Sequence, residues 1–186
     1  MKITVTPTHL PEVMIVEPKV FGDARGFFME SFNQAEFNEA TGTNHAFVQD
    51  NHSRSAHGVL RGLHYQLQQA QGKLVRVTQG AVWDVAVDMR QSSPRFGQWV
   101  GVELSADNHR QLWVPPGFAH GFVVLSDSAD FLYKTTDYYS PAHEHALMWN
   151  DPHVGVAWPL SDLRGAPQLS AKDMQGKLWE AASKFA

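Results

Sequence analysis

The chain has 186 residues, 43% hydrophobic and 18% charged, and this balance excludes an intrinsically disordered protein. Its formal net charge of −4 leaves no basic excess for a nucleic-acid backbone, so we expect no nucleic-acid partner. The absence of cysteine excludes disulfides, thiolate metal sites and cysteine nucleophiles. Without a signal-peptide pattern or a long apolar run, we expect one cytoplasmic domain over residues 1–186 and no membrane partner.

Short strands separated by glycine, proline, aspartate and serine turn signals account for most of the chain. In chain order they are predicted at 3–6, 13–17, 27–32, 46–52, 59–66, 74–79, 82–89, 99–104, 111–114, 121–125 and 131–136. Two helices are predicted, at 34–40 after the N-cap Asn33 and at 170–183 after the N-cap Ser170. This pattern favours an all-β sandwich or barrel with short peripheral helices and a C-terminal helical segment.

Polar side chains lie at alternating positions in two of the predicted strands. Gln49 and Asn51 share one face of an extended strand, and so do His64 and Gln66. Each of them singly is best explained by a solvated outer face. Together they predict a cavity for a polar ligand, because small barrels usually line their interior with apolar side chains.

The spacing of glycine, proline and histidine is typical of cupin jelly rolls that bind metals. Residues 58–64 keep the Gly-x5-His pattern and residues 115–120 keep Pro-x-Gly-x-x-His. However, Gln66 stands where a second histidine ligand is expected, and Lys73 stands where a glutamate is expected. A lysine repels a cation and attracts an anion, so we predict no metal. The histidines at 143 and 145 are predicted to lie in a surface loop rather than to bind a metal.

At these motifs the chain resembles the dTDP-4-dehydrorhamnose 3,5-epimerase family. The matching stretches occur in one order, at 21–28, 49–53, 60–66, 71–76, 116–122, 133–139, 149–152 and 169–173. The resemblance implies a cupin jelly-roll homodimer whose N-terminal strand pairs with the second subunit. It also implies a dTDP-4-keto-6-deoxyhexose substrate and no cofactor.

The chemistry of this substrate class explains several of the matching residues. A ketone at C4 acidifies the hydrogens at C3 and C5, and inversion needs a base on one face and an acid on the other. The resemblance implies His64 as base, Asp173 as its carboxylate partner and Tyr133 as acid. Lys73 and His120 are candidates to stabilise the enolate oxygen.

Asp84 lies within the apolar stretch at 81–87, where an unpaired carboxylate is costly. It either pairs with His120 inside the barrel or caps a loop at the strand end, and the sequence leaves both open. Simple alternation also places Arg61 and His64 on opposite faces of one strand. A bulge at Gly62 would bring them to the same face.

The remaining candidate residues match the substrate contacts of the family. Tyr139 and Phe27 resemble the pair that stacks on the thymine ring, with Tyr138 as the alternative to Tyr139. The full expected binding set is Arg25, Phe27, Glu30, Gln49, Asn51, Arg61, Lys73, Asp84, His120, Tyr139, Glu144 and Lys172.

Three other functions compete with inversion at both carbons: an epimerase acting at one carbon, a sugar-binding cupin without turnover, and a metal-dependent cupin oxygenase. The acid and base motifs do not separate a single-carbon epimerase from a 3,5-epimerase. The presence of His64, Tyr133 and Asp173 argues against a sugar-binding cupin without turnover. Gln66 and Lys73 argue against a metal-dependent oxygenase.

Overall fold

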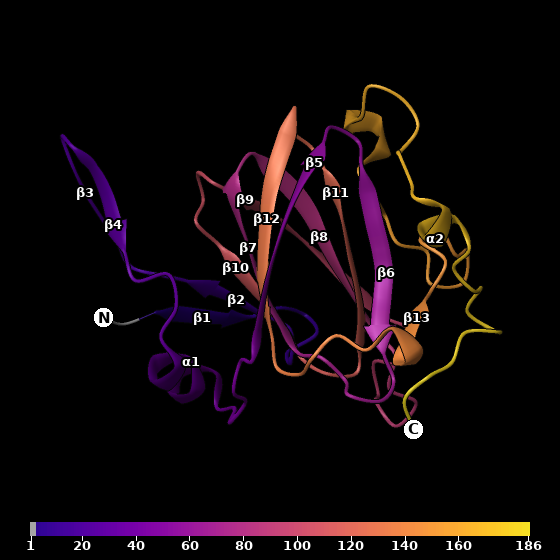
Figure 1. Cartoon of the computed structure of the whole chain (residues 1–186). Coiled ribbons are helices and arrows are strands. Elements are labelled where there is room, and N and C mark those ends of the chain that lie inside the picture. The colour runs from indigo at the N-terminus through magenta and orange to yellow at the C-terminus, as the bar shows by residue number, and fades with distance from the viewer. Residues whose placement is uncertain (1–2) are drawn as a thin grey trace.

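The structure, a computed structural model, describes residues 3–186, and its main body is two antiparallel sheets packed face to face (Figure 1). The six-stranded sheet has the order β1 (Thr4–Pro7), β2 (Met14–Glu17), β10 (Gln111–Val114), β7 (Lys73–Gln79), β12 (Ser128–Thr135) and β5 (Gln49–Ala56). The five-stranded sheet has the order β13 (Glu144–Ala146), β6 (Leu60–Gln66), β11 (Phe118–Val124), β8 (Ala81–Asp88) and β9 (Trp99–Ser105). The two sheets stay separate, so the predicted all-β jelly roll is an open sandwich.

The main hydrophobic core fills the space between the sheets. Alternate side chains of β7 and β12, such as Val75 and Phe131, meet those of β8 and β11, such as Val82 and Phe122. Phe122 and Phe131 stack with ring centroids 4.1 Å apart. Each fully buried side chain of this size contributes about 1.5–3 kcal/mol to folding. This core supports the strands that carry the polar residues at one end of the sandwich.

Two other segments cover the outer faces of the sheets. Helix α1 (Gln34–Thr41) packs Phe37 against Trp113 on the six-stranded sheet. Its bounds agree with the predicted helix, and Asn33 caps it by accepting two amide hydrogen bonds. The C-terminal segment covers the five-stranded sheet through residues such as Trp158 and Trp179. Within residues 3–186, no helix has both the length and the apolar character needed to cross a membrane.

The predicted C-terminal helix at 170–183 is wrong beyond its first turn. Only α2 (Ala171–Met174) is α-helical, although Ser170 caps it as expected. Lys177 instead exchanges backbone hydrogen bonds with the end of β13 and the residues that follow it, donating to Ala146 and accepting from Met148, both at 2.8 Å. A Cβ at Gly176 would lie 2.8 Å from Met148. This close bridge uses the backbone groups that a longer helix would need.

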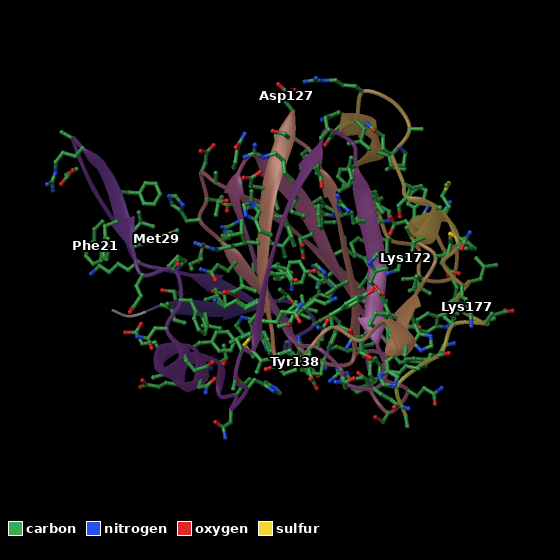
Figure 2. The ribbon with its side chains drawn as sticks, in the orientation of Figure 1. Phe21, Met29, Asp127, Tyr138, Lys172 and Lys177 are labelled. Carbon is green, nitrogen blue, oxygen red and sulfur yellow. The ribbon has the colours of Figure 1, made fainter. Side chains whose placement is uncertain are left out.

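A hairpin of β3 (Val20–Asp23) and β4 (Gly26–Met29) projects from the sandwich (Figure 1). The expected strand at 27–32 overlaps β4, whereas the sequence pattern predicts neither β3 nor the position of the hairpin. Figure 2 labels Phe21 and Met29 on this arm. Phe27 is 61% exposed, and the other aromatic side chains of the hairpin are exposed as well. The arm therefore adds little to the core of its own chain.

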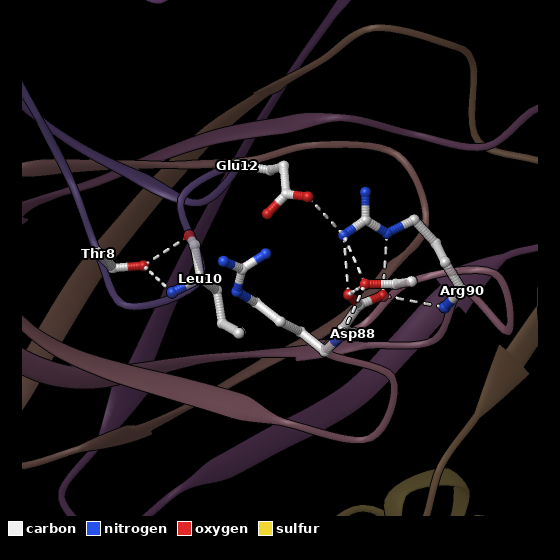
Figure 3. A network of polar contacts seen from close by, with 7 residues as sticks. Thr8, Leu10, Glu12, Asp88 and Arg90 are labelled. Atoms are coloured by element: carbon white, nitrogen blue, oxygen red, sulfur yellow. Dashed lines mark hydrogen bonds and ion pairs between the residues drawn. The ribbon is translucent and has the colours of Figure 1, made fainter.

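A charged cluster closes the sandwich near the end of β8 (Figure 3). The Arg90 guanidinium contacts the buried Asp88 at 2.7 Å and Glu12 at 3.0 Å. It also lies over the Phe118 ring, 4.7 Å from its centroid. The contacts with the two carboxylates tie the turn between β1 and β2 to β8, and they raise the pKa of Arg90. Two short 3-10 helices, η1 (Pro141–His143) and η2 (Leu160–Asp162), complete the elements.

Candidate active site

A cavity of about 410 Å³ lies at the polar end of the sandwich, with walls from both sheets and α2. Most of the predicted site residues meet there, namely Asn51, Arg61, His64, Lys73, His120, Tyr133, Tyr139, Glu144, Lys172 and Asp173. Gln49 and Asp84 stand directly behind this lining, in contact with Asn51 and His120. The structure therefore brings together residues that the sequence separates by more than a hundred positions.

A bulge in β6 places His64 and Arg61 on the cavity side together. His64 pairs with His120 of β11, but the register then shifts so that Arg61 pairs with Phe122. Gly62 has φ +127°, and a Cβ there would lie 2.5 Å from the Gly121 Cα. Only glycine fits this close approach of two backbones. The expected bulge at Gly62 is thus confirmed.

His64 meets a carboxylate inside the cavity wall. Its Nε2 lies 2.9 Å from Asp173 Oδ1, within ion-pair distance but not aligned for a linear hydrogen bond. The imidazole is 25% exposed, whereas the carboxylate is 4% exposed. Burial favours the neutral acid, but contacts with His64, Ser170 and the Gly62 amide outweigh it and hold the pKa of Asp173 well below its usual range. Asp173 is therefore an anion at neutral pH.

A second histidine–carboxylate pair lies deeper in the cavity. His120 Nε2 is 2.9 and 3.0 Å from the two oxygens of Asp84, which is fully buried. This contact decides between the two alternatives for Asp84 in favour of the pair with His120. Burial raises the pKa of Asp84, against the opposing effects of His120 and Lys73.

Lys73 is buried beside this pair and donates to the backbone oxygen of His64 at 3.3 Å. Burial lowers its pKa to about 8, against the opposing charges of Asp84 and Glu144. Near neutral pH this ammonium is therefore cationic, but only a small rise in pH removes its charge. Such a group is a suitable partner for an anion formed in the cavity.

Tyr133 stands in the cavity wall on β12, opposite Asn51 of β5. Its ring packs against Phe131, with centroids 6.0 Å apart. Burial, followed by the charge of Glu144, raises the pKa of the phenol. The hydroxyl is thus protonated at neutral pH, and it makes no hydrogen bond to any residue in 3–186.

A polar chain crosses the mouth of the cavity. Glu144 accepts hydrogen bonds from the Tyr139 hydroxyl at 2.6 Å and from Lys172. The Tyr139 amide donates to Gln49 at 3.0 Å, which joins β5 to the same loop. Tyr138, labelled in Figure 2, is 59% exposed and does not line the cavity. The geometry therefore favours Tyr139 over Tyr138 as a ligand contact.

Gln66 serves a structural purpose at the position of the missing metal ligand. Its amide donates to the Tyr138 backbone at 3.2 Å and accepts from the Ser140 amide at 2.9 Å, which fixes the loop that carries Tyr139. The expected surface loop at His145 is wrong, because this residue lies in β13 and stacks on Tyr65. Among residues 3–186, no group of three or more histidine and acidic side chains is placed to hold a metal.

Three predicted contacts do not reach the cavity of their own chain. Arg25 and Phe27 lie on the projecting hairpin, where Arg25 pairs with Asp23. Glu30 follows that hairpin and accepts from Asn33. Sequence motifs record which residues occur, but not how the hairpin that carries them is placed relative to the cavity.

Some lining residues lie within the matching sequence stretches but are not among the expected site residues, including Ser53, Gln71 and Ser170. Ser170 is expected from its position only as a helix cap, yet its hydroxyl donates to Asp173 at 2.6 Å. The capping box of a serine followed three residues later by an acid is the signal that could have found this contact.

Known proteins share the sequence and the fold of this chain. A family model described as dTDP-4-dehydrorhamnose 3,5-epimerase matches residues 7–181. The dTDP-4-dehydrorhamnose 3,5-epimerase of Pseudomonas aeruginosa is 64% identical over 180 residues, covering 97% of this chain and 98% of that protein. A crystal structure of dTDP-6-deoxy-D-glucose-3,5-epimerase from Legionella pneumophila, in complex with dTDP-4-keto-L-rhamnose, has a TM-score of 0.93 and 55% identity. It covers 96% of this chain and 94% of the other.

The fold also resembles an enzyme of different regiochemistry. ChmJ, a 3'-monoepimerase from Streptomyces bikiniensis solved with dTDP-quinovose, has a TM-score of 0.85 and 34% identity, covering 92% of this chain and 86% of the other. It shares the fold with the 3,5-epimerases above at a lower sequence identity to this chain.

Proposed function

Because this chain belongs to the dTDP-4-dehydrorhamnose 3,5-epimerase family, we propose that its cavity inverts a dTDP-linked 4-keto sugar with His64 as base and Tyr133 as acid. The protein is an isomerase that converts dTDP-4-dehydro-6-deoxy-D-glucose to dTDP-4-dehydro-L-rhamnose. The observation that carries the assignment of roles is the His64–Asp173 contact in the same cavity as the protonated Tyr133.

The first step is removal of the proton from the carbon next to the C4 ketone. His64 accepts this proton, and the anionic Asp173 stabilises the imidazolium that forms. The electrons of the broken C–H bond move to the C4 oxygen, which becomes an enolate. Lys73 of β7 and His120 of β11 both line the cavity and stabilise this oxygen as its charge develops.

The second step returns a proton to the opposite face of the carbon. Tyr133 is suited to this because burial keeps its phenol protonated, and an enolate is a strong enough base to take the proton. The cationic side chains of Arg61 and Lys172 oppose the effect of burial on the pKa of Tyr133, so they stabilise the phenolate that remains. His64 then releases its proton to water and Tyr133 regains one from water, after which the same two steps at the second carbon complete the double inversion.

The rim of the cavity binds the nucleotide in this proposal. Arg61 and Lys172 supply positive charge for the diphosphate, while Gln49 and Asn51 supply amide groups. Tyr139 supplies an exposed aromatic face for thymine.

We also propose that the protein acts as a homodimer in the cytoplasm. Arg25, Phe27 and Glu30 can contact the substrate only in a second copy, because their own chain holds them away from its cavity. The exposed apolar hairpin and the edge strand β1 supply surfaces through which two copies of the chain can pair. The absence of cysteine is consistent with a reducing compartment.

The decisive experiment supplies dTDP-4-keto-6-deoxyglucose to the protein in deuterated water and follows C3 and C5 by NMR. We expect deuterium at both carbons, and formation of dTDP-L-rhamnose when a reductase and NADPH are added. Exchange and inversion at one carbon only would assign the protein to the single-carbon epimerases. Binding without exchange would contradict the proposed catalysis.

A further inference from the structure

Both oxygens of the Asp173 carboxylate are held by fixed donors. Oδ1 lies 2.9 Å from His64 Nε2 and accepts the Gly62 amide at 3.0 Å. Oδ2 accepts the amide of Ser170 at 3.2 Å and its hydroxyl at 2.6 Å. Because the side chain is almost fully buried, these contacts decide how the carboxylate faces the imidazole.

The Ser170 hydroxyl has two partners at once. It donates to Asp173 Oδ2 and accepts the Asp173 amide at 3.2 Å, which closes the capping box of α2. Since α2 has only four residues, its own backbone hydrogen bonds do little to fix its start. By contrast, a hydroxyl that donates to a carboxylate at 2.6 Å makes a strong charge-assisted hydrogen bond. The Ser170 hydroxyl therefore makes the shortest of the contacts that orient Asp173.

We propose that Ser170 is a positioning residue for the epimerase reaction, whose hydroxyl fixes the Asp173 carboxylate so that Oδ1 stays on His64. This inference rests on the proposed role of His64 as the base. Ser170 moves no proton of the sugar and acts only through Asp173. Without the hydroxyl, Oδ2 keeps only the longer contact with the Ser170 amide, so the carboxylate turns more easily about its Cβ–Cγ bond and Oδ1 is held less firmly beside the imidazole. Misplacement of a catalytic group by even about 1 Å slows the chemical step strongly.

The test compares Ser170→Ala with Ser170→Thr in the full-length protein, with dTDP-4-keto-6-deoxyglucose as substrate. For Ser170→Ala we expect kcat to fall about tenfold or more, because the base loses its fixed partner. KM should stay within about twofold, because the groups proposed to bind the nucleotide are unchanged. Ser170→Thr keeps both the hydroxyl and the capping function, so it should restore kcat to within about threefold of the parent.

A matched control is available beside Asp88. Ser93 donates to the buried Asp88 at 2.6 Å and accepts the Arg95 amide at 3.1 Å, which repeats the bonding of Ser170 away from the cavity. Ser93→Ala removes the same kind of hydrogen bond and therefore reports the effect of general loosening. We expect it to leave kcat within about twofold of the parent.

The outcomes separate this inference from the proposed function. If the parent protein does not turn over the substrate, the proposed function fails and the inference fails with it. If the parent is active but Ser170→Ala keeps its kcat, the inference alone is wrong. It is also wrong if KM rises as much as kcat falls, if Ser170→Thr does not restore kcat, or if Ser93→Ala lowers kcat equally.

Discussion

Replacing Tyr133 by Phe removes the proposed acid and leaves its ring in place. The phenyl ring can keep its contact with Phe131, 6.0 Å away between centroids, and its place beside the main core. The hydroxyl makes no hydrogen bond to residues 3–186, so its loss should change the free energy of unfolding by no more than about 1 kcal/mol. Loss of a general acid typically costs about 100- to 10,000-fold in rate, or roughly 3–5 kcal/mol in the barrier. The effect on catalysis should therefore far exceed the effect on folding.

The assay is proton NMR of the substrate in deuterated water, with thermal unfolding as the control for folding. In Tyr133→Phe, His64 still removes the proton, and Lys73 and His120 still face the enolate oxygen. We expect deuterium to enter at C3 or C5 with retained configuration while epimerisation falls by at least about 100-fold. If exchange and epimerisation fall to zero together, Tyr133 is needed before the enolate forms. If epimerisation continues at the parent rate, Tyr139 or a water molecule is the acid.

The other predictions concern the base, the buried cation and the absence of a metal. His64→Ala should lower kcat by at least about 100-fold while calorimetry finds dTDP binding within a few-fold of the parent, and near-parent turnover would disprove its role. Since the pKa of Lys73 is lowered to about 8, kcat should fall as pH rises through that value and the ammonium loses its proton. The folded pKa lies below the unfolded value of 10.5, so the unfolded state binds more protons there. The contribution of Lys73 to the free energy of unfolding should therefore rise as pH increases from about 8 toward 10.5. A kcat that does not change between about pH 7 and 9 would contradict the catalytic role of Lys73. Exhaustive chelation with EDTA should leave activity unchanged, whereas loss restored by a divalent metal would overturn this expectation.

Most strands are predictable because their side chains alternate in polarity and turn residues separate them. Each predicted strand overlaps an observed one, and the helix after Asn33 has nearly its predicted bounds. The short strand β13 carries too few residues to produce such a pattern. The C-terminal helix prediction failed because helix propensity is local, whereas the bridge between Leu147 and Lys177 is a tertiary contact.

From the residues alone the site is predictable in its members but not in its pairings, and the His64–Asp173 pair is expected only from the family resemblance. The polar faces of Gln49 and Asn51, and of His64, indicate a cavity from alternation alone, and the structure places them in or directly behind its lining. The two environments of Asp84 are equally compatible with the sequence, since a carboxylate in an apolar strand fits either. Folding decides between them by placing β8 beside β11, which brings His120 to Asp84.

The sequence by itself determined the all-β class, the family and the residue types that carry the chemistry, because these depend on local alternation and on motif order. Only the tertiary structure decided that Asp173 meets His64, that Arg61 shares its cavity, and that the hairpin carrying Arg25 does not reach it. The physical reason is that these outcomes depend on contacts between segments distant in sequence. The bulge at Gly62 is an example, because the backbones at Gly62 and Gly121 approach so closely that a Cβ at either position would clash.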